Sequence, residues 1–228
     1  MTGTNRGSAL LIDLDGTLTD PAEGIVGCFR LALEAMGRSA PPAAELTWII
    51  GPPLRGSFAR LLSESGDPEA AIEIYRRRYS TVGLFEAAVY DGVNQALHDL
   101  RAAGTRLFLC TAKPAVYAER ILARFDLKRH FEAAYGDELD GRYQDKGDLI
   151  ARILDEQELE ADECCMWGDR EHDVLAASRH GIPTIGALWG YGGADELRAA
   201  GAAALCKRPS EVPAAFRTLP RPMRARAS

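Results

Sequence analysis

The stretch "LLIDLDGTLTD" (residues 10–20) joins an apolar run to three aspartates, Asp13, Asp15 and Asp20. A short continuous apolar run that stops at polar residues is typical of a buried strand. Residues two apart in an extended chain point to the same side, so Asp13 and Asp15 should project together from the strand's carboxyl end. Asp20 is interpreted as a helix cap, because Pro21 follows it at a position that suits the first residue of a helix.

Short apolar runs of the same kind recur along the chain, separated by segments with helical periodicity. They are "TRLFLC" (105–110), "EAAY" (132–135), "ECCMW" (163–167) and "PTIGAL" (183–188). Such alternation predicts an α/β fold in which helices cover both faces of a mostly parallel sheet.

Residues 20–89 break this alternation, because they contain successive helical patterns and no convincing strand. The sequence therefore predicts a core formed by residues 1–19 and 90–228 and an inserted helical domain at 20–89. Within the insertion, "GPPLRG" (51–56) is expected to form a loop between two helices, since its prolines and glycines continue neither helix.

Composition restricts the class of partner. The chain has 228 residues and a formal charge of −6, which argues against nucleic-acid polymers and anionic membranes as general partners. Its five cysteines form no CxxC pair, and no apolar run has membrane-spanning length. We expect a cytoplasmic protein that binds a small molecule.

The two aspartates after the first strand have a chemical consequence. Carboxylates so close together repel each other unless one is protonated or a cation lies between them. A hard divalent cation, Mg²⁺, is the simplest solution. For this pair alone, a "DG" turn that merely ends the strand is an equally good interpretation.

Three further motifs follow predicted strands or begin helices. In "LFLCTAKP", the Thr111 hydroxyl and the next backbone N–H groups, starting with Ala112, could hold phosphate oxygens at a helix start. In "YQDKGDLI", Lys146 begins a helix, an end that disfavours a cation unless it meets an anion. In "MWGDREHD", Asp169 follows a strand and Asp173 lies one helical turn further. Each has an ordinary alternative: Thr111 and Asp173 could cap helices, and Lys146 could be solvated.

In this order, the four motifs resemble the haloacid dehalogenase superfamily, in particular its phosphoglycolate phosphatase-like phosphatases. The resemblance implies a Rossmann-like core with an inserted helical cap domain. It also implies that Asp13 is the nucleophile, which forms an aspartyl-phosphate, and that Asp15 is the general acid and base. Thr111, Ala112 and Lys146 would then bind the transferring phosphoryl group.

The resemblance further implies a Mg²⁺ site formed by Asp13, Asp15 and Asp169, with Asp173 orienting the ligands or waters around the metal. Dehalogenases of the superfamily lack the second aspartate, so the presence of Asp15 favours a phosphatase, that is, a phosphoric monoester hydrolase. A catalytically idle regulatory or binding protein of the same fold is the alternative from another class.

The substrate is expected to be a small phosphorylated metabolite. Residues 135–150 and 188–202 look similar to a bacterial branch associated with nucleoside 5′-monophosphates, and phosphoglycolate is the alternative substrate. In related enzymes a cap loop reads the leaving group. The candidates here are Trp48, which could stack on a base, and Arg55, which could donate hydrogen bonds; the alternative is that Trp48 packs among helices and Arg55 is solvated.

Overall fold

The computed structural model describes residues 8–62, 66–139, 142–143 and 145–219. Over these residues the chain forms two compact units. One consists of Met1–Leu18 with Tyr90–Ser228, and the other of Thr19–Val89. Each unit has its own secondary structure and core.

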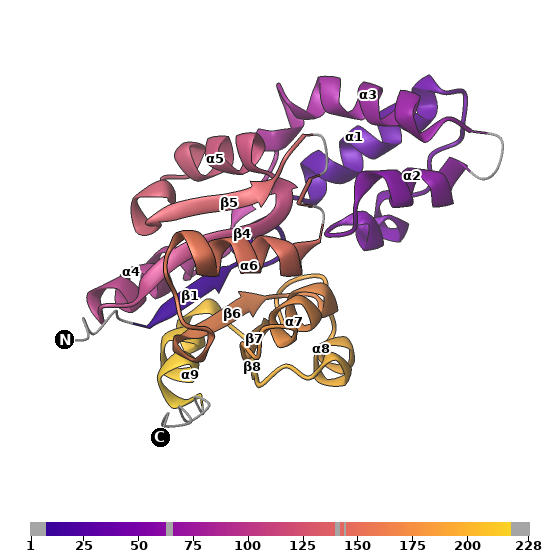
Figure 1. The fold of residues 1–228 in the computed structure, drawn as a ribbon. Coiled ribbons are helices and arrows are strands. Elements are labelled where there is room, and N and C mark those ends of the chain that lie inside the picture. The colour runs from indigo at the N-terminus through magenta and orange to yellow at the C-terminus, as the bar shows by residue number, and fades with distance from the viewer. Residues whose placement is uncertain (1–7, 63–65, 140–141, 144, 220–228) are drawn as a thin grey trace. The chain divides into compact units, whose positions relative to one another are not determined.

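A parallel sheet of six strands forms the centre of the larger unit (Figure 1). Its strands are β1 (Ala9–Ile12), β4 (Arg106–Pro114), β5 (Ala133–Asp137), β6 (Cys164–Gly168), β7 (Thr184–Ala187) and β8 (Ala204–Cys206). Their order is β5-β4-β1-β6-β7-β8, which confirms the predicted α/β fold. The sequence did not predict β8, because its apolar run "AAALC" (202–206) consists mostly of alanine, which favours helices.

Helices connect the strands of this sheet. They are α4 (Val93–Ala102), α5 (Ala115–Arg124), α6 (Lys146–Glu156), α7 (Glu171–Ser178), α8 (Ala194–Ala200) and α9 (Val212–Thr218), with short 3₁₀ helices at Lys128–His130, Ala161–Glu163 and Pro209–Glu211.

Alternation along β1 builds a core on each face of the sheet. Leu11 belongs to a buried cluster that contains Phe108 and Met166 of the neighbouring strands and Leu149 and Ile153 of α6. The intervening β1 residues point to the opposite face and are also fully buried. A strand that is apolar on both faces is typical of a parallel sheet covered by helices on both sides.

The central position of β1 determines where a ligand can bind. This strand lies between β4 and β6. The strands β4 and β5 are added on one side of it, and β6, β7 and β8 on the other. Ligands of open parallel sheets bind outside the carboxyl ends of the strands at such a point, where the winding reverses. Asp13 is the first residue beyond β1, so it lies at the carboxyl end of this central strand, where such ligands bind.

The smaller unit consists mainly of helices, α1 (Ala22–Ala35), α2 (Leu54–Leu62) and α3 (Pro68–Tyr79), with short 3₁₀ helices at Ala43–Glu45, Thr47–Ile49 and Gly83–Phe85. Its two ends, β2 (Thr19–Asp20) and β3 (Ala88–Val89), pair as antiparallel strands, which corrects the expectation that this segment has no strand. The pairing brings the entry and exit of the inserted segment together.

Aromatic side chains from three helices form the core of the smaller unit. The Phe29 ring stacks on that of Phe58, with 4.2 Å between centroids, and meets the edge of Tyr75 at 5.1 Å. At α3, Asp67 is the N-cap and accepts hydrogen bonds from two backbone N–H groups of the helix. At α1 the N-cap is Pro21, one residue after the expected Asp20, although Asp20 still accepts from Ala22 N at 3.0 Å.

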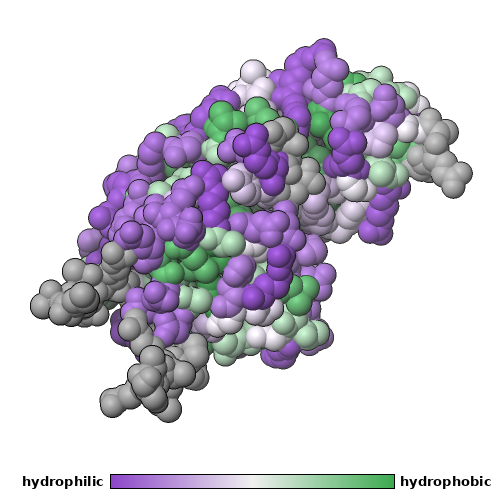
Figure 2. Space-filling model, in the orientation of Figure 1, coloured by the Kyte–Doolittle hydropathy of each residue, from purple (hydrophilic) through white to green (hydrophobic). Residues whose placement is uncertain are grey.

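Hydrophilic residues predominate on the face of the molecule that Figure 2 shows, and the hydrophobic residues visible there form separate areas. Among the described residues, no helix combines the length and the apolar character needed to cross a membrane.

Candidate active site

Asp13 continues the hydrogen-bond ladder of β1 for one residue beyond the strand. Its backbone N–H donates to Trp167 O at 2.9 Å, which fixes the chain against β6. The side chain of Asp13 is only 10% exposed. The carboxylate is therefore held at the sheet edge with limited contact to water.

Lys146 pairs with this carboxylate. It is the first residue of α6, as predicted, and its Nζ lies 3.0 Å from Asp13 Oδ1 and 2.5 Å from Asp173 Oδ1. Burial alone would lower the pKa of Lys146, but the two carboxylates raise it above its ordinary value. The lysine is thus a permanent buried cation between two acids, which removes the alternative that it is solvated.

Asp13, Asp169 and Asp173 form a group of buried carboxylates. Each offers an oxygen, and these oxygens lie within 4.8 Å of one another. Burial raises the pKa of Asp169 well above its ordinary range, and the charges of Asp173 and Asp13 raise it further. Burial also raises the pKa of Asp173, against the effect of Lys146. Such acids favour either protonation or a cation between them.

Hydrogen bonds fix the orientation of the two acids contributed by β6 and α7. Asp169 accepts from Thr17 Oγ1 at 3.2 Å and from Tyr191 N at 2.8 Å. Asp173 accepts from Arg170 N at 3.1 Å as well as from Lys146. Asp173 therefore caps the N-terminus of α7, which was its alternative role, and also pairs with Lys146; its orientation of a metal's ligands stays a prediction.

Asp15 forms an ion pair with Lys113. Its Oδ2 lies 2.7 Å from Lys113 Nζ, and its side chain is not a member of the buried group of three carboxylates. Among the described residues, Asp15 Oδ1 is buried without a hydrogen-bond partner. Burial raises the pKa of Asp15, and the adjacent Lys113 opposes this effect. Asp15 is therefore not one of the three carboxylates that the structure brings together, and its ligation of a metal stays a prediction.

Thr111 lies at the same sheet edge, two residues beyond Leu109, which pairs with Ile12. It is buried, and its hydroxyl accepts from Lys113 N at 3.3 Å. The strand continues to Pro114 and α5 begins at Ala115, so Thr111 and Ala112 precede the helix by several residues. The expectation that they stand at a helix start is wrong, because β4 extends past its apolar run.

Four contributors to the site did not emerge from the sequence. Lys113 carried a signal, since it lies two residues after Thr111 and alternation could place both on one side. Thr17 and Tyr191 bind Asp169 from loops, where no periodicity indicates a direction. Gly16 has a φ of +82° and lies so close to Asp169 that a Cβ would be 2.2 Å from Oδ2, so the loop after β1 needs glycine there.

The two predicted specificity residues lie in the smaller unit, on η2 (Thr47–Ile49) and α2 rather than in one loop. Trp48 is half-buried, with the Arg60 guanidinium 4.1 Å from its ring centroid. Arg55 lies in the first turn of α2, which corrects the loop expected at 51–56, and forms an ion pair with Glu69 of α3. Its side chain is 68% exposed.

Comparison with known proteins agrees with this geometry. A family model described as haloacid dehalogenase-like hydrolase matches residues 10–187. A 5′-nucleotidase of Pseudomonas aeruginosa is 45% identical over 194 residues, which are 83% of this chain and 86% of that protein. A tyrosine-protein kinase, PtkA, of Mycobacterium tuberculosis strain H37Rv is 42% identical over 187 residues, and the match spans 82% of this chain and 64% of the kinase.

Among solved structures, a predicted phosphatase from Clostridium acetobutylicum has a TM-score of 0.88 and 35% identity, covering 93% of this chain and 99% of its own. The family model spans both the sheet edge with its carboxylates and the inserted helical unit. The chain therefore belongs to the haloacid dehalogenase-like hydrolase family, in which it is a phosphoric monoester hydrolase.

Proposed function

We propose that this protein is a Mg²⁺-dependent 5′-nucleotidase that hydrolyses nucleoside 5′-monophosphates through an aspartyl-phosphate on Asp13. The observation that carries the proposal is the buried Asp13 carboxylate, paired with Lys146 and adjacent to two further acids. This arrangement provides a nucleophile, a fixed cation and a site for a second cation within one cluster. The five free, buried cysteines suit a reducing compartment, and we place the reaction in the cytoplasm.

The charges of the cluster fit a divalent cation. We count the three carboxylates of Asp13, Asp169 and Asp173 with Lys146, and the neighbouring ion pair of Asp15 and Lys113, whose acid feels the charges of Asp13 and Lys146. Four negative charges against two positive ones leave a net charge of −2 when all are ionised, and one divalent cation restores neutrality. All candidate ligands are oxygens, which suits Mg²⁺.

Asp13 and Asp169 are the residues that would hold the cation. Asp173 already pairs with the Lys146 ammonium at 2.5 Å, whereas Asp169 accepts from two neutral donors, Thr17 Oγ1 and Tyr191 N. Asp173 would therefore orient its neighbours rather than bind the metal as its main role. When bound, the metal supplies positive charge to the phosphoryl oxygens and lowers the repulsion between phosphate and carboxylate.

The residues of the chain suit a two-step transfer. An Asp13 oxygen attacks phosphorus, the bond from phosphorus to the ester oxygen breaks, and Lys146 neutralises charge on the phosphoryl oxygens. Asp15 donates a proton to the departing oxygen. It then takes a proton from the water that attacks the aspartyl-phosphate, which releases phosphate and restores Asp13.

The environment of Asp15 supports this role. One carboxylate oxygen is held by Lys113, whereas the other is buried with no hydrogen-bond partner among the described residues. Lys113 fixes the orientation of the group, and the second oxygen remains available to carry a proton. We also propose that Thr111 and Ala112 contact the phosphoryl oxygens, because they lie near the carboxyl end of β1, just beyond the pairing of Leu109 with Ile12.

The choice of substrate rests on the 5′-nucleotidase relative and on the inserted unit. The residues of the larger unit named above act only on the phosphoryl group, so other residues must recognise the leaving group. We assign this reading to Trp48, through base stacking, and to Arg55, through charge-assisted hydrogen bonds. Arg55 can exchange its exposed partner Glu69 for a ligand at little cost, since exposed ion pairs are weak.

A substrate panel tests the proposal. We expect the wild-type kcat/KM to be higher for nucleoside 5′-monophosphates than for phosphoglycolate or p-nitrophenyl phosphate. In Arg55→Ala, kcat/KM for the nucleotides should fall roughly tenfold, the value of about one charge-assisted hydrogen bond. Hydrolysis of p-nitrophenyl phosphate should change little, because it offers no nucleoside to read.

Arg77→Ala is the matched control, since Arg77 is another exposed arginine of the smaller unit that pairs with a glutamate, Glu73. It should leave both substrates unaffected. A wild-type preference for phosphoglycolate would contradict the nucleotidase assignment. Equal losses on both substrates in Arg55→Ala would show that Arg55 does not read the nucleoside.

A further inference from the structure

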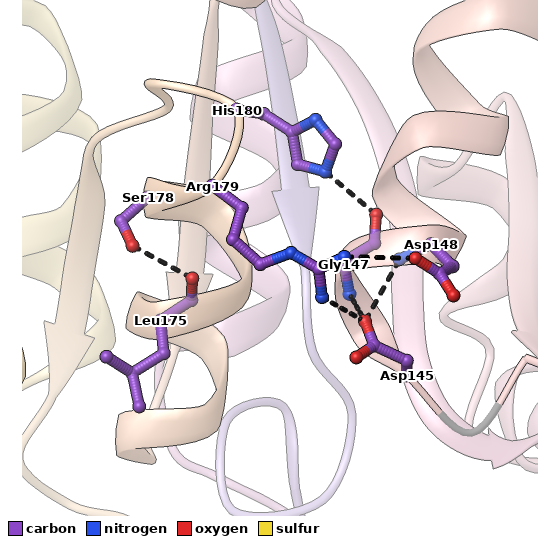
Figure 3. A network of polar contacts seen from close by, with 7 residues as sticks. All are labelled: Asp145, Gly147, Asp148, Leu175, Ser178, Arg179 and His180. Atoms are coloured by element: carbon purple, nitrogen blue, oxygen red, sulfur yellow. Dashed lines mark hydrogen bonds and ion pairs between the residues drawn. The ribbon is translucent and has the colours of Figure 1, made fainter.

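One arginine just beyond the end of α7 binds two acids that lie near Lys146 in the sequence. Asp145 is the N-cap of α6, and its Oδ1 accepts from Gly147 N at 2.7 Å and Asp148 N at 3.1 Å. Arg179 donates to that same oxygen at 2.6 Å and to Asp148 Oδ1 at 3.1 Å (Figure 3). The guanidinium therefore bridges two acids that flank the lysine in sequence.

The next residue adds a contact to the backbone. His180 Nε2 lies 2.9 Å from Gly147 O, and because a carbonyl only accepts, the ring nitrogen is the donor (Figure 3). Gly147 also permits the close approach of Arg179, since a Cβ there would lie 2.5 Å from Nη1. Arg179 and His180, just beyond α7, thus bind the first turn of α6.

The same helix holds the other end of the lysine. Asp173, in the first turn of α7, accepts from Lys146 Nζ at 2.5 Å. Lys146 is therefore fixed twice by α7: its ammonium by Asp173, and its backbone by Arg179 and His180 through the neighbouring residues. Together these contacts set how far the lysine reaches toward Asp13.

Stability alone does not account for the Arg179 contacts. The side chains of Arg179, Asp145 and Asp148 are 51%, 53% and 63% exposed. Ion pairs as exposed as these contribute little to the free energy of unfolding. They bind the helical turn that carries the buried Lys146, so their main effect is on geometry.

We propose that Arg179 is a positioning residue that holds the N-terminal turn of α6 against α7 so that the Lys146 ammonium stays between Asp13 and Asp173. This inference rests on the proposed phosphoryl-transfer role of Lys146. Without Arg179, the first turn of α6 gains freedom while the fold persists. A misplaced lysine should weaken both the binding of phosphate and the transfer step, since small displacements of catalytic groups lower rates strongly.

The test measures kcat and KM for p-nitrophenyl phosphate, the inhibition constant of inorganic phosphate, and Tm. In Arg179→Ala, kcat/KM should fall roughly tenfold or more and the inhibition constant should rise, with Tm almost unchanged. Arg179→Lys should recover part of the activity. The control is Arg198→Ala, another exposed arginine with one local ion pair, and it should change none of these values.

A double-mutant cycle with Asp145→Asn adds a second criterion, because asparagine keeps the helix cap but weakens the pairing with Arg179. If both act through one contact, the double variant should be no worse than Arg179→Ala alone. Unchanged activity in Arg179→Ala, a loss of activity that tracks a lower Tm, or additive effects in the cycle would each overturn the inference. An inactive wild-type enzyme would instead refute the proposed function.

Discussion

Replacing Asp13 with asparagine should lower kcat by about 10⁴-fold or more, because it removes the attacking oxygen charge and a proposed metal ligand together. The two side chains have nearly the same volume, and the backbone hydrogen bond from Asp13 N to Trp167 O does not depend on the side chain. The folded protein should therefore persist. Steady-state kinetics with p-nitrophenyl phosphate, together with circular dichroism, measure both properties.

Asp20→Asn is the matched control, since it makes the same chemical change a few residues further along the same stretch. Asp20 accepts from Ala22 N at the start of α1, and asparagine caps helices equally well. This variant should keep wild-type activity. An Asp13→Asn protein that is folded and as active as the wild type would remove Asp13 from the mechanism.

Removal of divalent metal should abolish activity, and Mg²⁺ should restore it. Ca²⁺ should support turnover poorly, because its larger and more variable coordination shell displaces the carboxylate from the phosphate. Full activity after exhaustive chelation would contradict the proposed charge balance of the cluster.

Mg²⁺ should also stabilise the folded protein, by an amount that depends on pH. The pKa values of Asp169 and Asp173 are raised in the folded protein. In the metal-free protein, the stability gained from protonating them is therefore fully present below the unfolded value of about 4 and is lost as pH rises through the folded values. Mg²⁺ competes with those protons, so the increase in Tm caused by Mg²⁺ should grow from acidic toward neutral pH.

Comparing Tm with and without Mg²⁺ at each pH cancels the contributions of groups far from the cluster. Asp169→Asn should abolish the Mg²⁺-dependent increase, because it removes one of the two proposed ligands. An increase that does not depend on pH, or that survives in this variant, would place the ion elsewhere.

Much of the core fold could be predicted from the sequence. Its longer buried strands are continuous apolar runs, and a run ending in Asp13 or Asp169 places that acid at the sheet edge without further information. The apolar run that contains β8 is mostly alanine, which favours helices over strands. The strands β2 and β3 exist only because the ends of the inserted segment pair with each other. The start of α2 at Leu54 was missed because prolines fit just before a helix as well as in a loop.

The sequence predicted most residues of the site, but it did not predict which of them contact one another. The pairing of Asp15 with Lys113 depends on the end of β4, where the register against β5 shifts between Thr111 and Pro114. Alternation along a strand does not define side-chain directions through such an irregularity. Likewise, the contact of Arg179 with Asp145 joins two helices, and neither helical pattern indicates which surface meets the other.

The covalent step can be observed directly. The enzyme is mixed with a nucleoside 5′-monophosphate labelled on phosphorus, quenched in acid within one turnover, reduced with borohydride and digested for peptide mass spectrometry. Reduction converts an aspartyl-phosphate to homoserine, so we predict acid-stable label on the quenched protein and homoserine at position 13 alone, with neither in Asp13→Asn. Label on another residue, or full turnover with no modified residue at position 13, would contradict the proposal that Asp13 is the nucleophile.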